Sequence, residues 1–236
     1  DLDKAKQKIT GQRVTYYDAI SMKSEVISKI PKEKFQQCLQ QILPADGLEL
    51  LSWTVRCDNW LARAQWLGEQ LESFPQLSKP QLQATLADWL LPYIGEVTSI
   101  VGLRAINLYD LLAATLTWEQ QQILTKEAPT EYKTPSGKSV PIIYDQHQGP
   151  TVSVALQEMF GEIHSPKIGG DKISIRFELL SPARRPIQTT SDLSNFWQTS
   201  YFEVAKEMRG RYPRHRWPDQ PLLEKAGKSI KRKQGE

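Results

Sequence analysis

Arginines and aromatic residues with the chemistry to bind a polyanion are concentrated toward the C-terminal end of this 236-residue sequence. Guanidinium groups bind phosphate, and flat rings stack on nucleic-acid bases. We therefore predict a nucleic-acid-binding surface of phosphate-contacting arginines and two stacking rings, made of Arg184, Arg185, Arg209, Arg211, Tyr212, Arg214, Arg216 and Trp217. The alternative is structural: the two rings clamp an extended segment to the core, and the arginines pair with nearby carboxylates or with helix C-terminal carbonyls.

The distribution of charge supports the first interpretation. The net charge is only +3, and residues 1–130 carry 13 Lys and Arg against 15 Asp and Glu. Residues 206–236 carry ten against four, including Lys206 and the run Lys231-Arg232-Lys233. A basic cluster of this kind raises affinity for phosphates without specifying a base sequence. For residues 225–233, a solubilising tail explains the composition equally well.

No pattern of a catalytic or metal site accompanies this basic cluster. Gly137-Lys138-Ser139 and Gly227-Lys228-Ser229 resemble the end of a phosphate-binding loop, but Tyr132 and Leu222 stand where that motif needs its first glycine. The three histidines are scattered, and neither HExxH, CxxC nor GxSxG occurs. We expect no catalytic residue, no metal ligand and no bound cofactor within this chain.

The remaining composition indicates a cytoplasmic, globular protein. Two cysteines without a paired motif favour free thiols in a reducing compartment. No run of about 18 apolar residues occurs, so we expect no membrane partner. The sequence opens on Asp1-Leu2-Asp3 without an initiator methionine, and we expect it to be a piece of a longer polypeptide.

The elements that must position the basic residues form an α+β fold, predicted as a small helical bundle followed by a mixed β-rich domain, a small barrel or sheet, with a packed C-terminal helix. Residues 1–30 predict one or two strands that bend near Asp18-Ala19 and complete an upstream domain. Residues 31–128 predict the bundle. We expect a first helix to end at Pro44, a second to begin at Asp58, a third to run from Ser78 to Gly95, and two shorter ones to be capped at Asn107 and Thr117. Their tryptophans are expected in the core or in packing between domains: Trp53, Trp60, Trp66, Trp89 and Trp118.

Residues 129–222 predict the β-rich domain, and residues 223–236 a basic disordered tail. Strands are expected over residues 140–144, 152–156, 173–179 and 187–190. A turn over residues 181–186 places Arg184 and Arg185 at its tip. One amphipathic helix, capped at Ser194 and ended by Gly210, is expected to pack its apolar stripe on the sheet: Phe196, Trp197, Tyr201, Val204 and Met208.

Several strings in the second half resemble a known family. Residues 154–161 (VALQEMFG), 178–186 (ELLSPARRP) and the segment through Trp217-Pro218-Asp219 resemble the C-terminal region of HrpB helicases, bacterial ATP-dependent helicases of the DExH/DEAH-box group. Residues 86–93 and 134–137 fit the same region. The resemblance implies a parent with two RecA-like domains and winged-helix, helical and OB-like modules, which uses ATP and Mg²⁺. It implies that residues 1–30 complete the OB-like module, and it supplies no counterpart here for the residues that bind ATP.

We therefore predict an accessory region that adds affinity for RNA or another nucleic acid to the helicase core of the same polypeptide. A second hypothesis is a scaffolding module, in which the tryptophan-rich helical half docks on that core or on a partner protein. An independent enzyme is disfavoured because no site for one is present. The resemblance assigns no role to the arginines, so their proposed contacts rest on residue type and charge alone.

Overall fold

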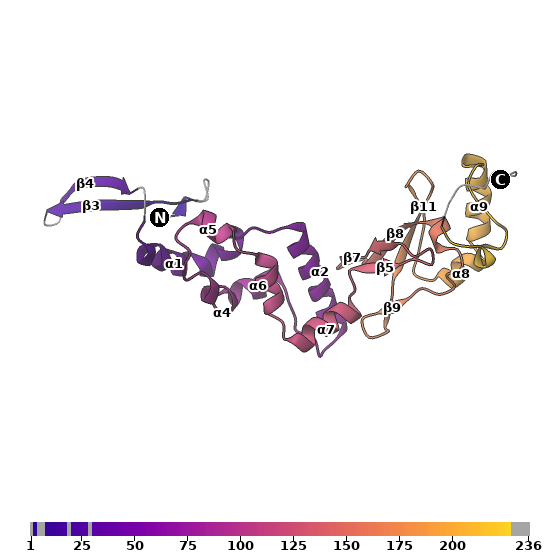
Figure 1. Cartoon of the computed structure of the whole chain (residues 1–236), viewed down its shortest axis with the longest axis horizontal. Helices are drawn as coiled ribbons and strands as arrows, with labels where there is room; N and C mark the ends of the chain where they lie inside the picture. The colour runs from indigo at the N-terminus through magenta and orange to yellow at the C-terminus, as the bar shows by residue number, and fades with distance from the viewer. Residues whose placement is uncertain (1, 4–7, 18–19, 28–29, 228–236) are drawn as a thin grey trace. The chain divides into compact units, whose positions relative to one another are not determined.

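The computed structural model describes residues 2–3, 8–17, 20–27 and 30–227 (Figure 1). Contacts divide the chain into two compact units, the first formed by residues 1–61 and 77–121 and the second by residues 62–76 and 122–236. Helices α2 (Val55–Gln70) and α7 (Trp118–Glu127) contribute residues to both units. The predicted α+β class is confirmed. The expected bend at Asp18-Ala19 and residues 228–236 of the expected tail lie outside the described residues, and the four predicted domain ranges stay predictions.

The first unit contains short strand pairs and a set of helices. Strands β3 and β4 form an antiparallel hairpin, with a register shift between Thr15 and Tyr16, and β1 pairs with β2. The remaining elements of this unit are helical. The bounds are β1 (Leu2–Asp3), β2 (Lys8–Ile9), β3 (Gly11–Tyr17), β4 (Ile20–Ile27), α1 (Lys32–Leu50), α3 (Lys79–Ala84), α4 (Leu86–Trp89), η1 (Leu91–Tyr93), α5 (Ile100–Arg104) and α6 (Leu108–Ala114).

Helix α1 continues six residues beyond Pro44, where the sequence predicted its end. A proline inside a helix destabilises the helix, because it has no N–H to donate and its ring distorts the preceding turn. The Gln83 side chain bonds the turn that follows Pro44: its Nε2 donates to the carbonyl oxygens of Leu43 (2.6 Å) and Pro44 (3.0 Å), and its Oε1 accepts from the Leu48 N–H (3.0 Å). A residue far along the chain thus stabilises the part of the helix beyond Pro44.

Two other helix boundaries differ from the prediction. Helix α2 begins at Val55 and not at Asp58, because the Thr54 hydroxyl accepts from the Cys57 N–H (3.3 Å) and provides the cap. The helix expected from Ser78 to Gly95 is divided into α3, α4 and η1. Ser78 does cap its start, but the Thr85 hydroxyl bonds the Gln81 carbonyl (3.0 Å) and closes the first segment.

The tryptophans are core residues with one clear exception. Trp60, Trp66 and Trp89 are buried as predicted. Trp53 is half-buried, and Lys79 Nζ lies 4.7 Å from its ring centre. Trp118, at the first position of α7, is 69% exposed and is not a core residue of this chain, so packing between domains stays a prediction for it. Both cysteines are free.

The second unit is built on a four-stranded sheet with the order β12-β11-β8-β7. The β8–β11 pair is parallel, with Phe177 opposite Val152 and Leu179 opposite Val154. Its other two strand pairs are antiparallel. Two smaller pairs, β5–β6 and β9–β10, complete the strands described here. The bounds are β5 (Glu131–Lys133), β6 (Ser139–Pro141), β7 (Ile143–Asp145), β8 (Gly149–Ala155), η2 (Leu156–Met159), β9 (Lys167–Ile168), β10 (Ile173–Ser174), β11 (Arg176–Leu180) and β12 (Pro186–Thr190).

Two strands predicted as continuous are each divided into two. The strand predicted over residues 140–144 is β6 and β7, and the strand predicted over residues 173–179 is β10 and β11. Within β11 the predicted alternation holds, since Phe177 and Leu179 are buried while Arg176 and Glu178 are half-buried. The sheet therefore presents one apolar face to the rest of the unit.

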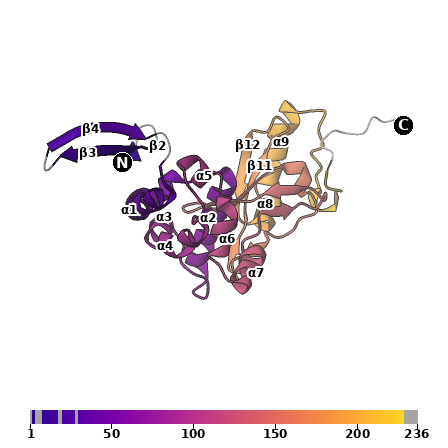
Figure 2. The same ribbon diagram turned by 60° about the vertical axis from the view of Figure 1, so that its left-hand side comes forward.

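The C-terminal helix is two helices, α8 (Leu193–Gln198) and α9 (Tyr201–Arg211), which lie beside the sheet (Figures 1 and 2). Asp192, not Ser194, caps α8, because its carboxylate accepts from the Asn195 N–H (3.0 Å). The Thr199 hydroxyl bonds the Asn195 carbonyl (2.7 Å) where the break occurs. Gly210 lies inside α9, and the helix ends before Tyr212, which is followed by a proline.

The predicted apolar stripe crosses both helices and fills the core of the second unit. The Trp197 ring centre lies 4.9 Å from that of Phe196 and 5.3 Å from that of Tyr201. All three rings are at most 3% exposed, as is Met208. Val204 is half-buried. This aromatic cluster packs α8 against α9 and so sets the orientation of α9 and of the basic residues at its end.

Candidate nucleic-acid interface

Four cationic side chains on α9 and just after it are exposed. They are Lys206, Arg209 and Arg211 on the helix, and Arg214 beyond its end. Arg211 Nη2 lies 3.0 Å from Glu207 Oε1, one helical turn earlier, in a pair that is more than half exposed on both sides. Such a surface pair is weak and exchanges readily with another anion. Among the described residues, Arg214 has no ion-pair partner.

Arg209 and Arg216, by contrast, hold the extended segment that follows α9. Arg209 Nη2 donates to the Trp217 carbonyl (2.6 Å) and to Asp219 Oδ1 (3.0 Å). Arg216 donates to Glu224 Oε2 (3.1 Å) and to the Lys225 carbonyl (2.8 Å), and its guanidinium lies 5.5 Å from the centre of the Phe160 ring. These two arginines have the local partners that the structural alternative required.

The two rings predicted to stack on bases differ in accessibility. Trp217 is only 4% exposed, and its Nε1 donates to the Tyr212 carbonyl (3.1 Å). A base has no access to this ring, so the stacking role does not fit Trp217. Tyr212 is half-buried and packs edge-on against His215, with ring centres 5.8 Å apart. Near them, burial raises the pKa of Tyr201, whose hydroxyl donates to the Pro218 carbonyl (2.7 Å).

Arg184 and Arg185 lie on a different element, the turn between β11 and β12, as predicted. The Ser181 hydroxyl accepts from the Arg185 N–H (3.1 Å), and the Arg184 N–H donates to the Ser181 carbonyl (2.9 Å). Arg184 has φ 61°, a left-handed conformation that a long side chain seldom adopts. Both arginine side chains are exposed.

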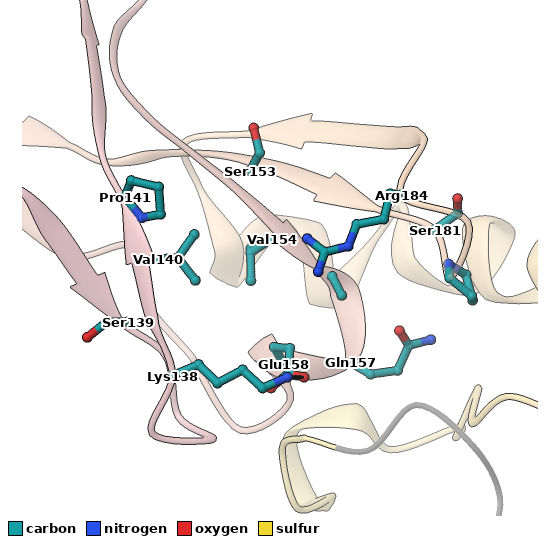
Figure 3. Close-up of a pocket in the computed structure, with 12 residues that line it drawn as sticks. Lys138, Ser139, Val140, Pro141, Ser153, Val154, Gln157, Glu158, Ser181 and Arg184 are labelled. Carbon is teal, nitrogen blue, oxygen red and sulfur yellow. Dashed lines mark hydrogen bonds and ion pairs between the residues drawn. The ribbon is translucent and has the colours of Figure 1, made fainter. Parts of the chain in front are cut away.

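The Arg184 turn forms one wall of a pocket of about 390 Å³ (Figure 3). Strand β6, the end of β8 and the start of η2 supply the other walls. Apolar lining comes from Val140, Pro141, Val154, Ala155 and Pro182. We call this feature the β8–β11 pocket.

Two buried polar residues of η2 line the same pocket. Glu158 is 8% exposed and accepts from the Ser136 hydroxyl and from Lys138 Nζ, and the Lys138 side chain in this ion pair is 65% exposed. Gln157 is fully buried; its Nε2 donates to the Arg216 carbonyl (3.4 Å), but its Oε1 has no hydrogen-bond partner. Sequence reasoning missed both residues. Adjacent polar residues directly after an alternating apolar strand, in the string that carries the family resemblance, were the signal that could have found them.

The glycine-lysine-serine string at Gly137 does not form a nucleotide site. Gly137 has φ 88° and sits in the turn between β5 and β6, so the string leads into a strand. A phosphate-binding loop needs a helix start there, where backbone N–H groups meet the phosphates. Lys138 is instead paired with Glu158. This string therefore does not form a phosphate-binding loop.

Two other kinds of feature are absent from the described residues. No group of three or more His, Cys, Asp or Glu side chains in this part of the chain is arranged to hold a metal ion. Nor does a helix within the described ranges combine the length and apolar character needed to cross a membrane.

The fold and sequence match a known class of helicase region. A family model, HrpB_C, described as "ATP-dependent helicase C-terminal", matches residues 89–221, which is more than half of the chain. The chain therefore belongs to this family of ATP-dependent helicase C-terminal regions.

Individual relatives agree with that assignment. The chain is 37% identical over 223 residues to the "ATP-dependent RNA helicase HrpB" of Escherichia coli, which covers 93% of this chain and 27% of the relative. Two solved structures of the E. coli protein, described as a DExH-box NTPase and as a DEAH/RHA helicase, superpose with TM-scores of 0.77 and 0.70, both at 33% identity. They cover 94% and 90% of this chain, and this chain covers 30% and 27% of theirs. It thus spans under a third of the length of the relatives it matches.

Proposed function

We propose that this chain is a nucleic-acid-binding accessory region of a cytoplasmic ATP-dependent RNA helicase, and that its helicase core belongs to the same polypeptide. The observation that carries the proposal is the exposed cationic end of α9. Over residues 201–216 there are five Lys and Arg against two Glu, and Lys206, Arg211 and Arg214 face solvent. The relative named as an RNA helicase supports RNA as the polyanion.

The basic residues divide into two roles in this proposal. Lys206, Arg211 and Arg214 contact phosphates of a single strand, because they are exposed and at most weakly paired. Arg209 and Arg216 position the segment after α9 through their carbonyl and carboxylate partners. Affinity gained in this way is independent of base sequence and falls as salt rises. In this proposal ATP and Mg²⁺ act in another part of such a helicase, because Gly137-Lys138-Ser139 leads into a strand and forms no phosphate loop.

The test is the salt dependence of binding to a fluorescent single-stranded RNA, measured by anisotropy on the whole chain. The double variant Arg211→Gln/Arg214→Gln is compared with a matched control, Lys133→Gln/Lys167→Gln, which changes two exposed lysines of the same unit. Each lost phosphate contact lowers the slope of log affinity against log salt by about 0.7 for a single strand. We expect that loss only in the arginine variant. Equal slopes in the wild type and both variants, with unchanged affinity, contradict the proposal.

An exposed tryptophan supports a second candidate function, docking on the helicase core or on a partner protein. Trp118 is 69% exposed although it is one of the largest apolar side chains. In this function the first unit binds protein and not nucleic acid. Docking is supported if the whole chain captures the helicase portion of the E. coli relative and the Trp118→Ala variant does not. In that case the whole chain also does not shift RNA. Capture that is unaffected by Trp118→Ala contradicts a role for this residue.

A further inference from the structure

Helix α9 carries an aromatic ring that is open to solvent. Phe202, at the second position of the helix, is 51% exposed, whereas Tyr201 before it is fully buried. The two rings meet at 71° with their centres 5.8 Å apart, which is an edge-to-face contact. Such a contact covers at most one face of the Phe202 ring. A single exposed apolar residue is common on a protein surface, so the neighbours of Phe202 decide whether it is a binding residue.

The residues that share a face of α9 with Phe202 are cationic. Lys206 and Arg209 follow Phe202 by four and seven residues, the spacing that brings side chains onto one face of a helix. Glu203 and Glu207 each follow Phe202 or Lys206 directly, so they are turned about 100° away around the helix. The exposed ring and the two cations therefore lie on one face of α9, and the carboxylates of the helix lie on another.

The two cations of this face differ in their partners. Arg209 donates to the Trp217 carbonyl and to Asp219, so it keeps its structural role. Lys206 is exposed and has no ion-pair partner among the described residues. It lies one helical turn beyond Phe202, at a spacing that leaves about 5–6 Å between the two Cβ atoms. A flat group on the ring therefore brings an attached anion within reach of Lys206.

We propose that Phe202 stacks on a base of single-stranded RNA while Lys206 binds the adjoining phosphate. This inference rests on the proposed function, and it supplies the aromatic contact that the buried Trp217 cannot make. Every base has a flat face, so stacking adds affinity without selecting a sequence, as phosphate contacts do. A nucleotide suits this face better than an apolar protein surface, which would remove the Lys206 charge from water without a partner for it.

The test measures how much of the affinity depends on bases. Two RNA strands have the same length and phosphate number, but one is intact and the other has abasic positions. Anisotropy gives the ratio of their affinities for the whole chain. Phe202→Leu keeps an apolar side chain and removes the flat ring, so we expect the ratio to fall at least about fivefold. Phe202→Trp keeps a ring and should preserve the ratio. The matched control is Tyr93→Leu, which removes a 57% exposed ring of the first unit and should leave the ratio unchanged.

The salt dependence tests the phosphate contact separately. Lys206→Gln should weaken binding to both strands alike and lower the slope of log affinity against log salt by about 0.7. Phe202→Leu removes no charge and should leave that slope unchanged. An unchanged slope in Lys206→Gln overturns the contact assigned to Lys206.

A ratio that is unchanged in Phe202→Leu overturns the inference. If the urea midpoint of that variant falls, Phe202 is a packing residue. If the variant instead loses capture of the helicase portion of the E. coli relative, Phe202 docks on protein. Equal affinity of the wild type for intact and abasic strands also overturns the inference, while salt-dependent binding by Arg211 and Arg214 stands. Absence of binding to either strand contradicts both proposals.

Discussion

Replacing Arg209 with methionine separates a structural arginine from a phosphate-binding one. Methionine keeps an unbranched side chain along α9 but cannot donate to the Trp217 carbonyl or to Asp219. Both bonds are present in the folded protein, at 2.6 and 3.0 Å. We therefore expect Arg209→Met to destabilise the second unit and to leave the salt dependence of RNA binding unchanged.

The size of the effect follows from the exposure of the two partners. A hydrogen bond with a charged donor contributes about 1.5–3 kcal/mol when it is shielded from water. The Arg209 side chain is 50% exposed, which reduces the carbonyl bond to about 1 kcal/mol. Asp219 is 88% exposed, so the ion pair adds at most about 0.5 kcal/mol. A loss of about 1 kcal/mol lowers the melting temperature of a chain this size by about 2–4 °C.

Urea denaturation of the two variants Arg209→Met and Asp219→Asn provides the assay. The aspartate variant removes the ion pair but keeps the carbonyl bond, so its midpoint should shift much less than that of Arg209→Met. Anisotropy titrations with single-stranded RNA at several salt concentrations complete the comparison. An unchanged midpoint for Arg209→Met, together with a salt slope reduced by about 0.7, would show that Arg209 contacts phosphate. That result refutes the structural role.

Two further substitutions test the packing that positions the site. Gln83→Leu removes the amide that bonds Pro44 and Leu48, and should cost about 1–3 kcal/mol in urea denaturation, whereas the exposed Gln37→Leu should cost little. The Gly170 N–H, bonded to the Glu127 carboxylate (2.7 Å), holds the pKa of Glu127 below its ordinary value of 4.5, with Lys126 as a second cause. A depressed folded pKa gives stability that is present above the unfolded pKa and lost as pH falls through the folded one, so Glu127→Gln should flatten the acid side of the stability curve below about pH 4.5. A curve parallel to that of the wild type argues against this linkage.

Local sequence patterns predicted the type of most elements but few of their ends. The apolar stripe of the last helices and the alternation of β11 were correct because side-chain burial repeats with the period of the element. The boundaries at Pro44, Asp58 and Ser194 were wrong for a different reason. At Pro44 the decisive partner was Gln83, far along the chain, and at the other two sites a neighbouring hydroxyl or carboxylate capped the helix first.

The sequence by itself determined the family, the α+β class and the position of the basic segment, since these depend on residue identity, period and charge along the chain. Only the tertiary structure decided how each arginine is used. Arg209 and Arg216 have partners that lie eight to ten residues away around a bend, while Arg211 and Arg214 remain toward solvent. The β8–β11 pocket likewise exists only because parallel pairing of β8 and β11 brings Gln157 and Arg184 to one place. Contacts between such distant residues are set by the packing of whole elements, which leaves no local pattern in the sequence.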